Sequence, residues 1–145
     1  MLRLSKMTDY GTVIMSQMAG QPSRIFSAAE IAAASGLSVT TASKILKTLA
    51  RHALLTSVRG AKGGYMLARP PELISVAEVI AAMEGPLAVT ECGVPAGHCA
   101  QEAHCPSRDN WRRLNYVVRG ILDGISLLDL SRPLPDNVPQ PITRL

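Results

Sequence analysis

The feature that most constrains the fold is a pair of helix signals separated by one glycine, in residues 27–53. The run Ser27-Ala-Ala-Glu30 is a capping box, in which a hydroxyl and a carboxylate satisfy amides that a helix start leaves free. Gly36 supplies a left-handed stop, so the first helix is about two turns long. Ser38 caps a longer second helix, over about residues 39–53. This order predicts a helix-turn-helix.

The second of these helices has two unlike faces. Its apolar residues, expected to face the core, are Val39, Ala42, Ile45, Leu46 and Leu49. Its polar residues can reach the base edges and phosphates of a DNA major groove. We predict DNA contacts at Ser38, Thr40, Thr41, Ser43, Lys44 and Lys47, with the two lysines on phosphates. A protein-binding helix-turn-helix is the alternative.

A glycine-rich hairpin follows. Two short strand-like runs, residues 54–59 and 65–68, are joined by Gly60-Ala61-Lys62-Gly63-Gly64, which is typical of the wing of a winged helix. Arg59 and Lys62 flank its tip, where they can meet the sugar-phosphate backbone or enter a minor groove. Both are therefore further predicted DNA contacts.

Four further helices are predicted. One helix covers about residues 5–19, and a second capping box, Ser75-Val-Ala-Glu78, opens a helix that stops at Gly85-Pro86. A long helix beyond Ser107, gently broken at Gly120 and Gly124, is followed by a short helix capped by Ser126 to Asp129. The long helix carries an apolar stripe: Trp111, Leu114, Val118, Ile121, Leu122 and Ile125. Because the other helices are too few to cover this stripe, we predict that the chain forms a homodimer through this helix.

The predicted fold class is therefore mainly α with a small β-hairpin wing: a winged helix-turn-helix plus a long dimerisation helix. We assign residues 1–72 to DNA binding, residues 73–132 to the cysteine segment and dimerisation, and the proline-rich residues 133–145 to a disordered tail. Residues 1–70 hold nine Lys and Arg against two acidic residues, a net charge of +7, whereas residues 71–145 have six against nine. Double-stranded DNA is the expected partner of the basic part, and a merely solvated basic face is the alternative.

Cysteine usage indicates a sensor. The three cysteines of the chain, Cys92, Cys99 and Cys105, lie in one Gly- and Pro-broken segment. An odd number of thiols, with no signal peptide or long apolar run, favours the reducing cytoplasm and no membrane. The spacing lacks the paired C-x-x-C of a zinc ribbon, although zinc completed by His98 or His104 stays an alternative. Three thiolates also suit an iron-sulfur cluster.

No enzyme and no small-molecule substrate are expected. The sequence contains no legible Ser/His/Asp set and no pair of carboxylates suited to acid-base chemistry. The glycine-rich run at residues 60–64 lacks the Gly-Lys-Ser/Thr end of a phosphate-binding loop.

The motifs LSKMTDYG, SVRGAKGGYMLA and C-x6-C-x5-C before a Trp-containing helix resemble those of the bacterial iron-sulfur-cluster-binding winged-helix regulators. This is the family of the Isc regulator, the nitric-oxide-sensing Nsr repressor and the rhizobial iron regulator, and within it the chain is most similar to the regulators of Suf iron-sulfur assembly genes. The resemblance covers about residues 1–132. It implies a homodimeric transcriptional regulator that senses cluster status and controls assembly genes; a nitric-oxide- or iron-responsive repressor is the alternative.

The resemblance also implies a ligand set. Cys92, Cys99 and Cys105 would hold the cluster with one further ligand. Some members use a histidine three residues after the last cysteine, where this chain has Arg108. Others use an N-terminal aspartate of the partner subunit, which Asp9 matches, so a 4Fe-4S cluster is favoured over 2Fe-2S. A helix-capping or helix-dipole role is the alternative for Asp9. Ser43 replaces a glutamate that gates sequence choice in the Isc regulator.

Overall fold

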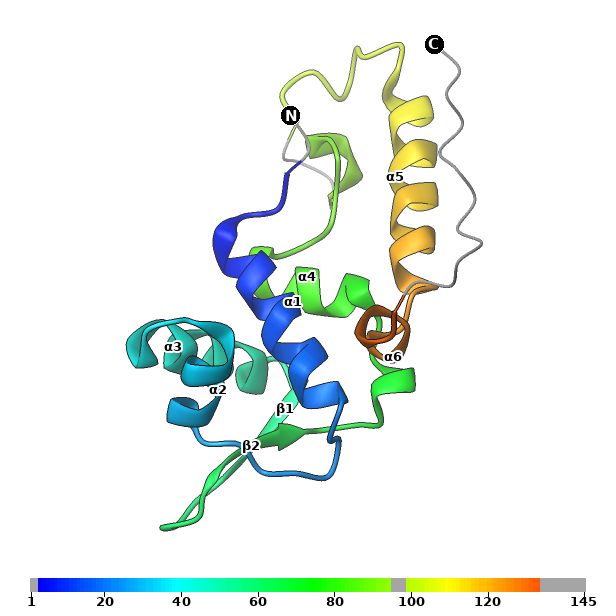
Figure 1. The fold of residues 1–145 in the computed structure, drawn as a ribbon. Coiled ribbons are helices and arrows are strands. Elements are labelled where there is room, and N and C mark those ends of the chain that lie inside the picture. Colours follow the sequence, from blue (N-terminus) through cyan, green and yellow to red (C-terminus); the bar gives the residue numbers. More distant parts are fainter. Residues whose placement is uncertain (1–2, 95–98, 134–145) are drawn as a thin grey trace.

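The computed structural model describes residues 3–94 and 99–133, and it is mostly helical with one two-stranded hairpin (Figure 1). Of the predicted disordered tail, residues 133–145, all but Pro133 lie outside the described residues. The elements are α1 Lys6–Ala19, α2 Ala28–Ser35, α3 Val39–Arg51, β1 Leu55–Val58, β2 Gly64–Leu67, η1 Pro71–Leu73, α4 Val76–Glu84, η2 Glu91–Gly93, α5 Arg108–Asp123 and α6 Leu127–Ser131. The predicted fold class is confirmed.

Serine caps fix where the helices begin. Ser27, Ser75 and Ser126 each form a complete capping box with the acidic residue three positions later. Gly36 ends α2 in the left-handed conformation, with φ of 66°. These local hydrogen bonds explain why the sequence located the helix starts correctly.

Helices α2 and α3 pack against each other and against α1, and the apolar face of α3 buries Ala42, Ile45, Leu46 and Leu49. Val39, predicted on the same face, is not buried with these residues, since 52% of its surface is exposed. Val39 is the first residue of α3, and its side chain lies at the rim of the apolar face. The helix also ends at Arg51 rather than residue 53, since Ala53 is left-handed, with φ of 59°.

The wing is an antiparallel pair in which Leu55 faces Leu67 and Val58 faces Gly64. Phe26, before α2, adds a third short pairing: its amide and carbonyl each bond Tyr65, at 2.8 Å. A Cβ atom on Gly64 would overlap the Phe26 carbonyl, and one on Gly63 would overlap the Val58 carbonyl. The two glycines therefore permit the close backbone contacts that hold the wing against the helical core.

One hydrophobic core joins the two predicted functional regions. Helices α4 and α6 both pack on α1, and they add Val79, Ala82 and Leu127 to the core built by α1–α3. Backbone hydrogen bonds from Val76 to Ile125, at 2.9 Å, and from Leu127 to Ile74, at 2.7 Å, join the chain after α5 to the start of α4. The division at residues 72 and 73 stays a prediction about function, within one packed unit.

Helix α5 stands along one side of the molecule and extends well past α4 (Figure 1). It runs through Gly120 without a break and ends before Gly124, so the predicted break at Gly120 is wrong. Two members of the apolar stripe, Val118 and Leu122, are half-buried, whereas the others are exposed: Trp111, Leu114, Ile121 and Ile125. Val117, which was not assigned to the stripe, is exposed beside them. A single protomer therefore leaves most of the stripe uncovered.

Candidate nucleic-acid interface and cysteine site

The outer face of α3 presents three exposed polar side chains, Thr40, Lys44 and Lys47. Ser38 is exposed as well, but its hydroxyl is engaged in hydrogen bonds at the start of the helix, and Thr41 is half-buried. The Ser38 hydroxyl accepts a hydrogen bond from the Thr41 amide at 3.1 Å and donates one to the Thr41 hydroxyl at 2.9 Å. These two hydroxyls thus cap the helix, and Ser43 is half-buried. Thr40, Lys44 and Lys47 are therefore the predicted contacts on this helix that are exposed and whose side chains form no hydrogen bond to another described residue.

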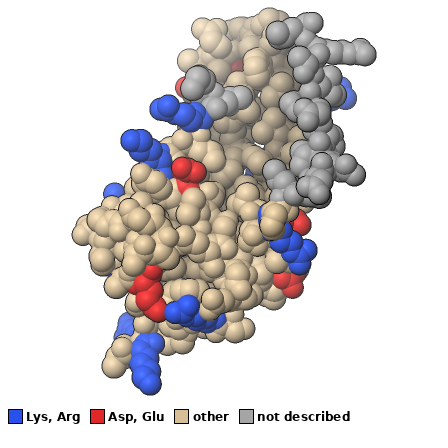
Figure 2. Space-filling model, in the orientation of Figure 1, with Lys and Arg blue, Asp and Glu red and all other residues tan. Residues whose placement is uncertain are grey.

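Arg59 and Lys62 are both exposed on the wing, and Figure 2 shows cationic side chains at the tip of the hairpin. Arg24 lies near the base of the wing, although the sequence did not single it out. Its guanidinium sits 4.6 Å from the centre of the Phe26 ring and pairs with Glu30 at 2.7 Å. The pKa of Glu30 is lowered, first by the Ser27 backbone amide. Only the aromatic residue two positions later could have marked Arg24 in the sequence.

The three cysteines are free and half-buried. Cys92 lies in η2, whereas Cys99 and Cys105 begin and end the turns before α5. Within residues 3–94 and 99–133, no three His, Cys, Asp or Glu side chains are close enough together to hold a metal ion. The structure therefore does not gather the predicted ligands into one group. His104 is exposed, and His98 lies outside the described residues.

A buried polar network connects Cys92 to α5. Asn115, which is 6% exposed, accepts a hydrogen bond from the Val89 amide at 2.5 Å and donates one to the Thr90 hydroxyl at 2.9 Å. That hydroxyl lies 3.1 Å from the Cys92 sulfur. A Cβ on Gly93 would overlap the Asn115 amide, so the glycine allows η2 to approach α5 closely. The sequence analysis did not find this network.

A second contact ties the cysteine segment to the same helix. Arg112 of α5 lies three residues before Asn115. It forms an ion pair with Glu102, which lies between Cys99 and Cys105. Cys92 and Arg112 also line one hollow of about 460 Å³ between η2 and α5. Helix α5 thus contacts the cysteine segment on both sides of residues 95–98, which lie outside the described residues.

Asp9 lies in the first turn of α1 and is exposed. The helix cap is Ser5 rather than Asp9, because the Ser5 hydroxyl accepts a hydrogen bond from the Thr8 amide at 3.2 Å. The other part of the alternative, a favourable interaction of Asp9 with the helix dipole, fits its place in the first turn. Among the described residues, the Asp9 carboxylate has no hydrogen-bond or ion-pair partner. The cysteine segment and the N-terminal end of α1 lie at the end of the molecule away from the hairpin (Figure 1).

Glu84 anchors this end of α1. Its carboxylate accepts hydrogen bonds from the Thr8 hydroxyl at 2.7 Å and from the Ser5 amide at 2.6 Å. These bonds, the Thr8 one first, hold the pKa of Glu84 below its usual value. Glu84 ends α4, directly before the chain that leads to Cys92. The start of α1 and the start of the cysteine segment are therefore joined.

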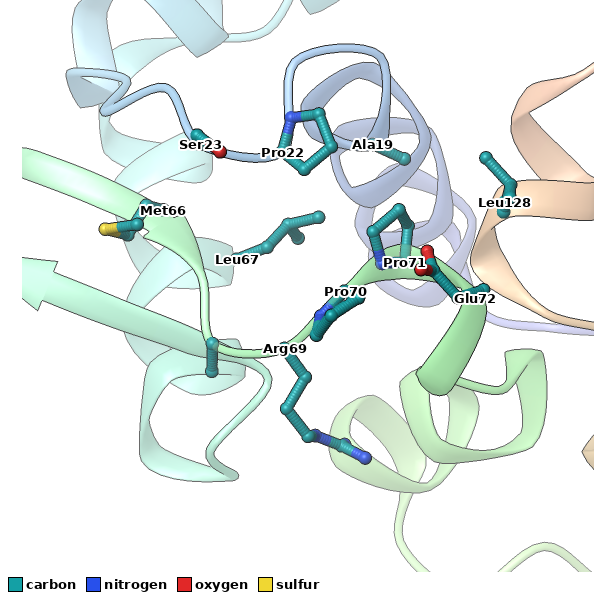
Figure 3. A pocket seen from close by; sticks show the side chains of 11 residues that line it. Ala19, Pro22, Ser23, Met66, Leu67, Arg69, Pro70, Pro71, Glu72 and Leu128 are labelled. Carbon is teal, nitrogen blue, oxygen red and sulfur yellow. The ribbon is translucent and has the colours of Figure 1, made fainter.

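A further hollow, of about 490 Å³, lies among the C-terminal end of α1, β2, η1 and α6 (Figure 3). Leu67, Pro70, Pro71 and Leu128 are among its lining residues. Arg69 at its edge donates hydrogen bonds to Glu78 at 2.6 Å and to the Leu73 carbonyl at 2.9 Å. Arg69 is thus engaged in structural contacts, and no catalytic set of side chains converges on this hollow.

Comparison with known proteins identifies the family. A family model described as Rrf2, iron-dependent transcriptional regulator, matches residues 4–133. The chain belongs to the Rrf2 family. It is 38% identical over 104 residues to an HTH-type regulator of Azotobacter vinelandii, covering 72% of this chain and 63% of that protein. It is 34% identical over 102 residues to the regulator IscR of Aliivibrio salmonicida, covering 70% and 60%. The match spans about three fifths of these curated relatives.

Two solved structures share the fold of this Rrf2 protein. CymR, the global cysteine regulator of B. subtilis, has a TM-score of 0.70 and 30% identity, covering 90% of this chain and 97% of that one. IscR of T. potens has a TM-score of 0.65 and 28% identity, covering 89% and 85%. These likenesses confirm the winged-helix fold, and the family and the relatives that the chain matches are described as transcriptional regulators. No helix in the described parts of the chain has the length and apolarity that a membrane crossing needs.

Proposed function

We propose that this Rrf2 regulator acts in the cytoplasm as a homodimer that senses iron-sulfur cluster status and controls iron-sulfur assembly genes of the Suf or Isc type. Its ligands would be Cys92, Cys99 and Cys105 of one subunit and Asp9 of the partner subunit. The family's iron dependence and the likeness to IscR support this proposal over a regulator without metal.

One observation carries the proposal: the segment that holds all three thiols packs on α5, the helix with the uncovered apolar stripe. A change in the cysteine segment would therefore act directly on the helix predicted to form the dimer. Because the distance between two winged regions depends on the dimer, the same change would alter DNA affinity.

The donor chemistry fits a cluster. Thiolates are the usual ligands of iron-sulfur sites, and the three thiols here are free and half-buried. A 4Fe-4S cluster bound here would be sensitive to oxygen and to iron supply, because the carboxylate is the weakest of its four protein ligands. Asp9 is exposed on α1, where a second subunit can reach it. As a ligand of the partner's cluster, Asp9 would hold the two winged regions at a fixed distance from each other.

DNA would be read by two copies of α3 about 34 Å apart, in half-sites one helical turn apart. Lys44 and Lys47 would contact phosphates, and Thr40 would contact bases at the start of α3. Val39 is exposed beside Thr40, and its apolar side chain fits a thymine methyl group. Arg59 and Lys62 would meet the backbone beside each half-site.

We expect Arg59→Ala and Lys62→Ala each to weaken operator binding and to lower its salt dependence by roughly one counterion, because each removes one phosphate contact. The measurement is the dissociation constant across a salt titration. Arg132→Ala, which removes an exposed cation after α6, is the matched control and should bind like the wild type. An unchanged salt slope in both wing variants would remove the wing from the interface.

The ligand role of Asp9 is tested by cluster lifetime. Anaerobically purified Asp9→Ala and Asp9→Asn should keep some cluster on three thiolates but lose it faster in air than the wild type. Asp9→Cys should retain it, because a thiolate is the softer ligand. Since Ser5 is the helix cap, all three variants should unfold within about 0.5 kcal/mol of the wild type. Equal decay of the visible absorption in all variants would exclude Asp9 as a ligand.

A zinc-structured or thiol-redox adaptor, which binds protein through its winged helix, is the second candidate. Its thiol-redox form needs no metal, and within the described residues no three metal-binding side chains lie together. Metal analysis together with an anaerobic absorption spectrum separates the two. Iron and sulfide with broad visible absorption support the proposed function, whereas a colourless protein, with or without zinc, supports the second candidate.

A further inference from the structure

The network around Asn115 has one allowed hydrogen-bond direction. The Val89 backbone amide can only donate, so the Asn115 atom facing it at 2.5 Å must be the amide oxygen. The Asn115 nitrogen then faces the Thr90 hydroxyl at 2.9 Å and donates to it. A backbone group thus fixes the orientation of a side chain that is nearly fully buried in the middle of α5.

This orientation determines what Thr90 can do. Its oxygen already accepts from Asn115, so its single hydrogen is available for the Cys92 sulfur, 3.1 Å away. A cysteine that ligates metal has lost its own proton and can only accept. In the ligated state the hydroxyl must therefore be the donor to Cys92.

We propose that Thr90 and Asn115 are positioning residues of the Cys92 ligand. Asn115 directs the Thr90 hydroxyl onto the Cys92 sulfur and so ties the first thiolate of the site to the middle of α5. This inference rests on the proposed function, because it concerns a cluster-bound thiolate. Hydrogen bonds from such outer partners orient metal ligands, and those to cluster sulfurs set the reduction potential.

The network also gives the site a route to the dimer helix. Leu114 and Val117, one residue before and two after Asn115, belong to the exposed apolar surface of α5. A displacement of Cys92 would pull on Asn115 through Thr90 and act on the part of α5 that carries these residues. The close fit of Gly93 against Asn115 leaves little room for η2 to move alone.

The test uses the full chain, reconstituted anaerobically with iron and sulfide, as wild type, Thr90→Val, Thr90→Ser and Asn115→Leu. Valine keeps the shape of threonine but removes the donor, whereas serine keeps the donor. We expect Thr90→Val and Asn115→Leu to release iron to a chelator about tenfold faster or more, and Thr90→Val to lower the reduction potential of the cluster. Thr90→Ser should match the wild type in both measurements. Thr56→Val, at an exposed site on β1, is the control for a threonine-to-valine change.

Amide hydrogen exchange tests the network in the apoprotein, without a cluster. In the apoprotein, the Val89 amide should exchange faster in Asn115→Leu than in the wild type, because it loses its acceptor. Thr90→Val that matches Thr90→Ser in iron release and in reduction potential would overturn the proposed role of the hydroxyl. A wild type that binds no cluster on reconstitution would overturn the proposed function itself, and this role with it.

Discussion

Replacing any one of Cys92, Cys99 and Cys105 by alanine is expected to abolish the visible absorption of anaerobically purified protein. A cluster that loses one of three thiolates keeps only two strong ligands and the weak carboxylate. The measurement is the absorption spectrum, with iron and sulfide content determined on the same sample. All three thiols are only half-buried, so the variants should fold and retain the helical circular dichroism of the wild type.

The matched control is His104→Ala, which changes an exposed metal-binding side chain next to Cys105. We expect this variant to keep its colour, because the proposed ligand set does not include His104. Loss of colour in His104→Ala, or a cysteine variant that keeps a full complement of iron and sulfide, would contradict the ligand assignment. Stoichiometric zinc without visible absorption in the wild type would favour the zinc-structured alternative.

A charge in the apolar stripe of α5 should separate the subunits. Ile121 is 61% exposed in one protomer, so Ile121→Asp leaves the fold of that protomer intact. In a dimer formed through the stripe, the carboxylate would be buried without a partner, which costs several kcal/mol. We expect a monomer in sedimentation and poor operator binding, since one winged region reads only a half-site.

Tyr116→Asp is the matched control for this prediction. Tyr116 is also an apolar residue of α5, 79% exposed, but it lies about 140° around the helix from Ile121. We expect Tyr116→Asp to sediment as a dimer. An intact dimer in Ile121→Asp would show that the subunits associate through another surface. Monomers in both variants would extend the interface around the whole helix.

The sequence by itself determined the elements whose signals are local. Capping boxes at Ser27, Ser75 and Ser126 involve groups three residues apart, so each helix start could be predicted without knowledge of packing. The left-handed Gly36 and the glycines of the wing depend on the conformation of a few adjacent residues. The exposed stripe of α5 could also be predicted, because its apolar residues recur at the helical period.

Only the tertiary structure decided the contacts between distant residues. Val39 fits the apolar pattern of α3 yet is exposed, because burial at a helix end depends on what packs over it. Asn115 bonds Thr90 from 25 positions away, and Glu84 bonds Ser5 from 79 positions away. Polar partners at such separations leave no periodic or spacing signal, since their meeting depends on how the helices pack. The helix starts and the apolar stripe could therefore be predicted from the sequence, whereas the contact between Cys92 and α5 required the fold.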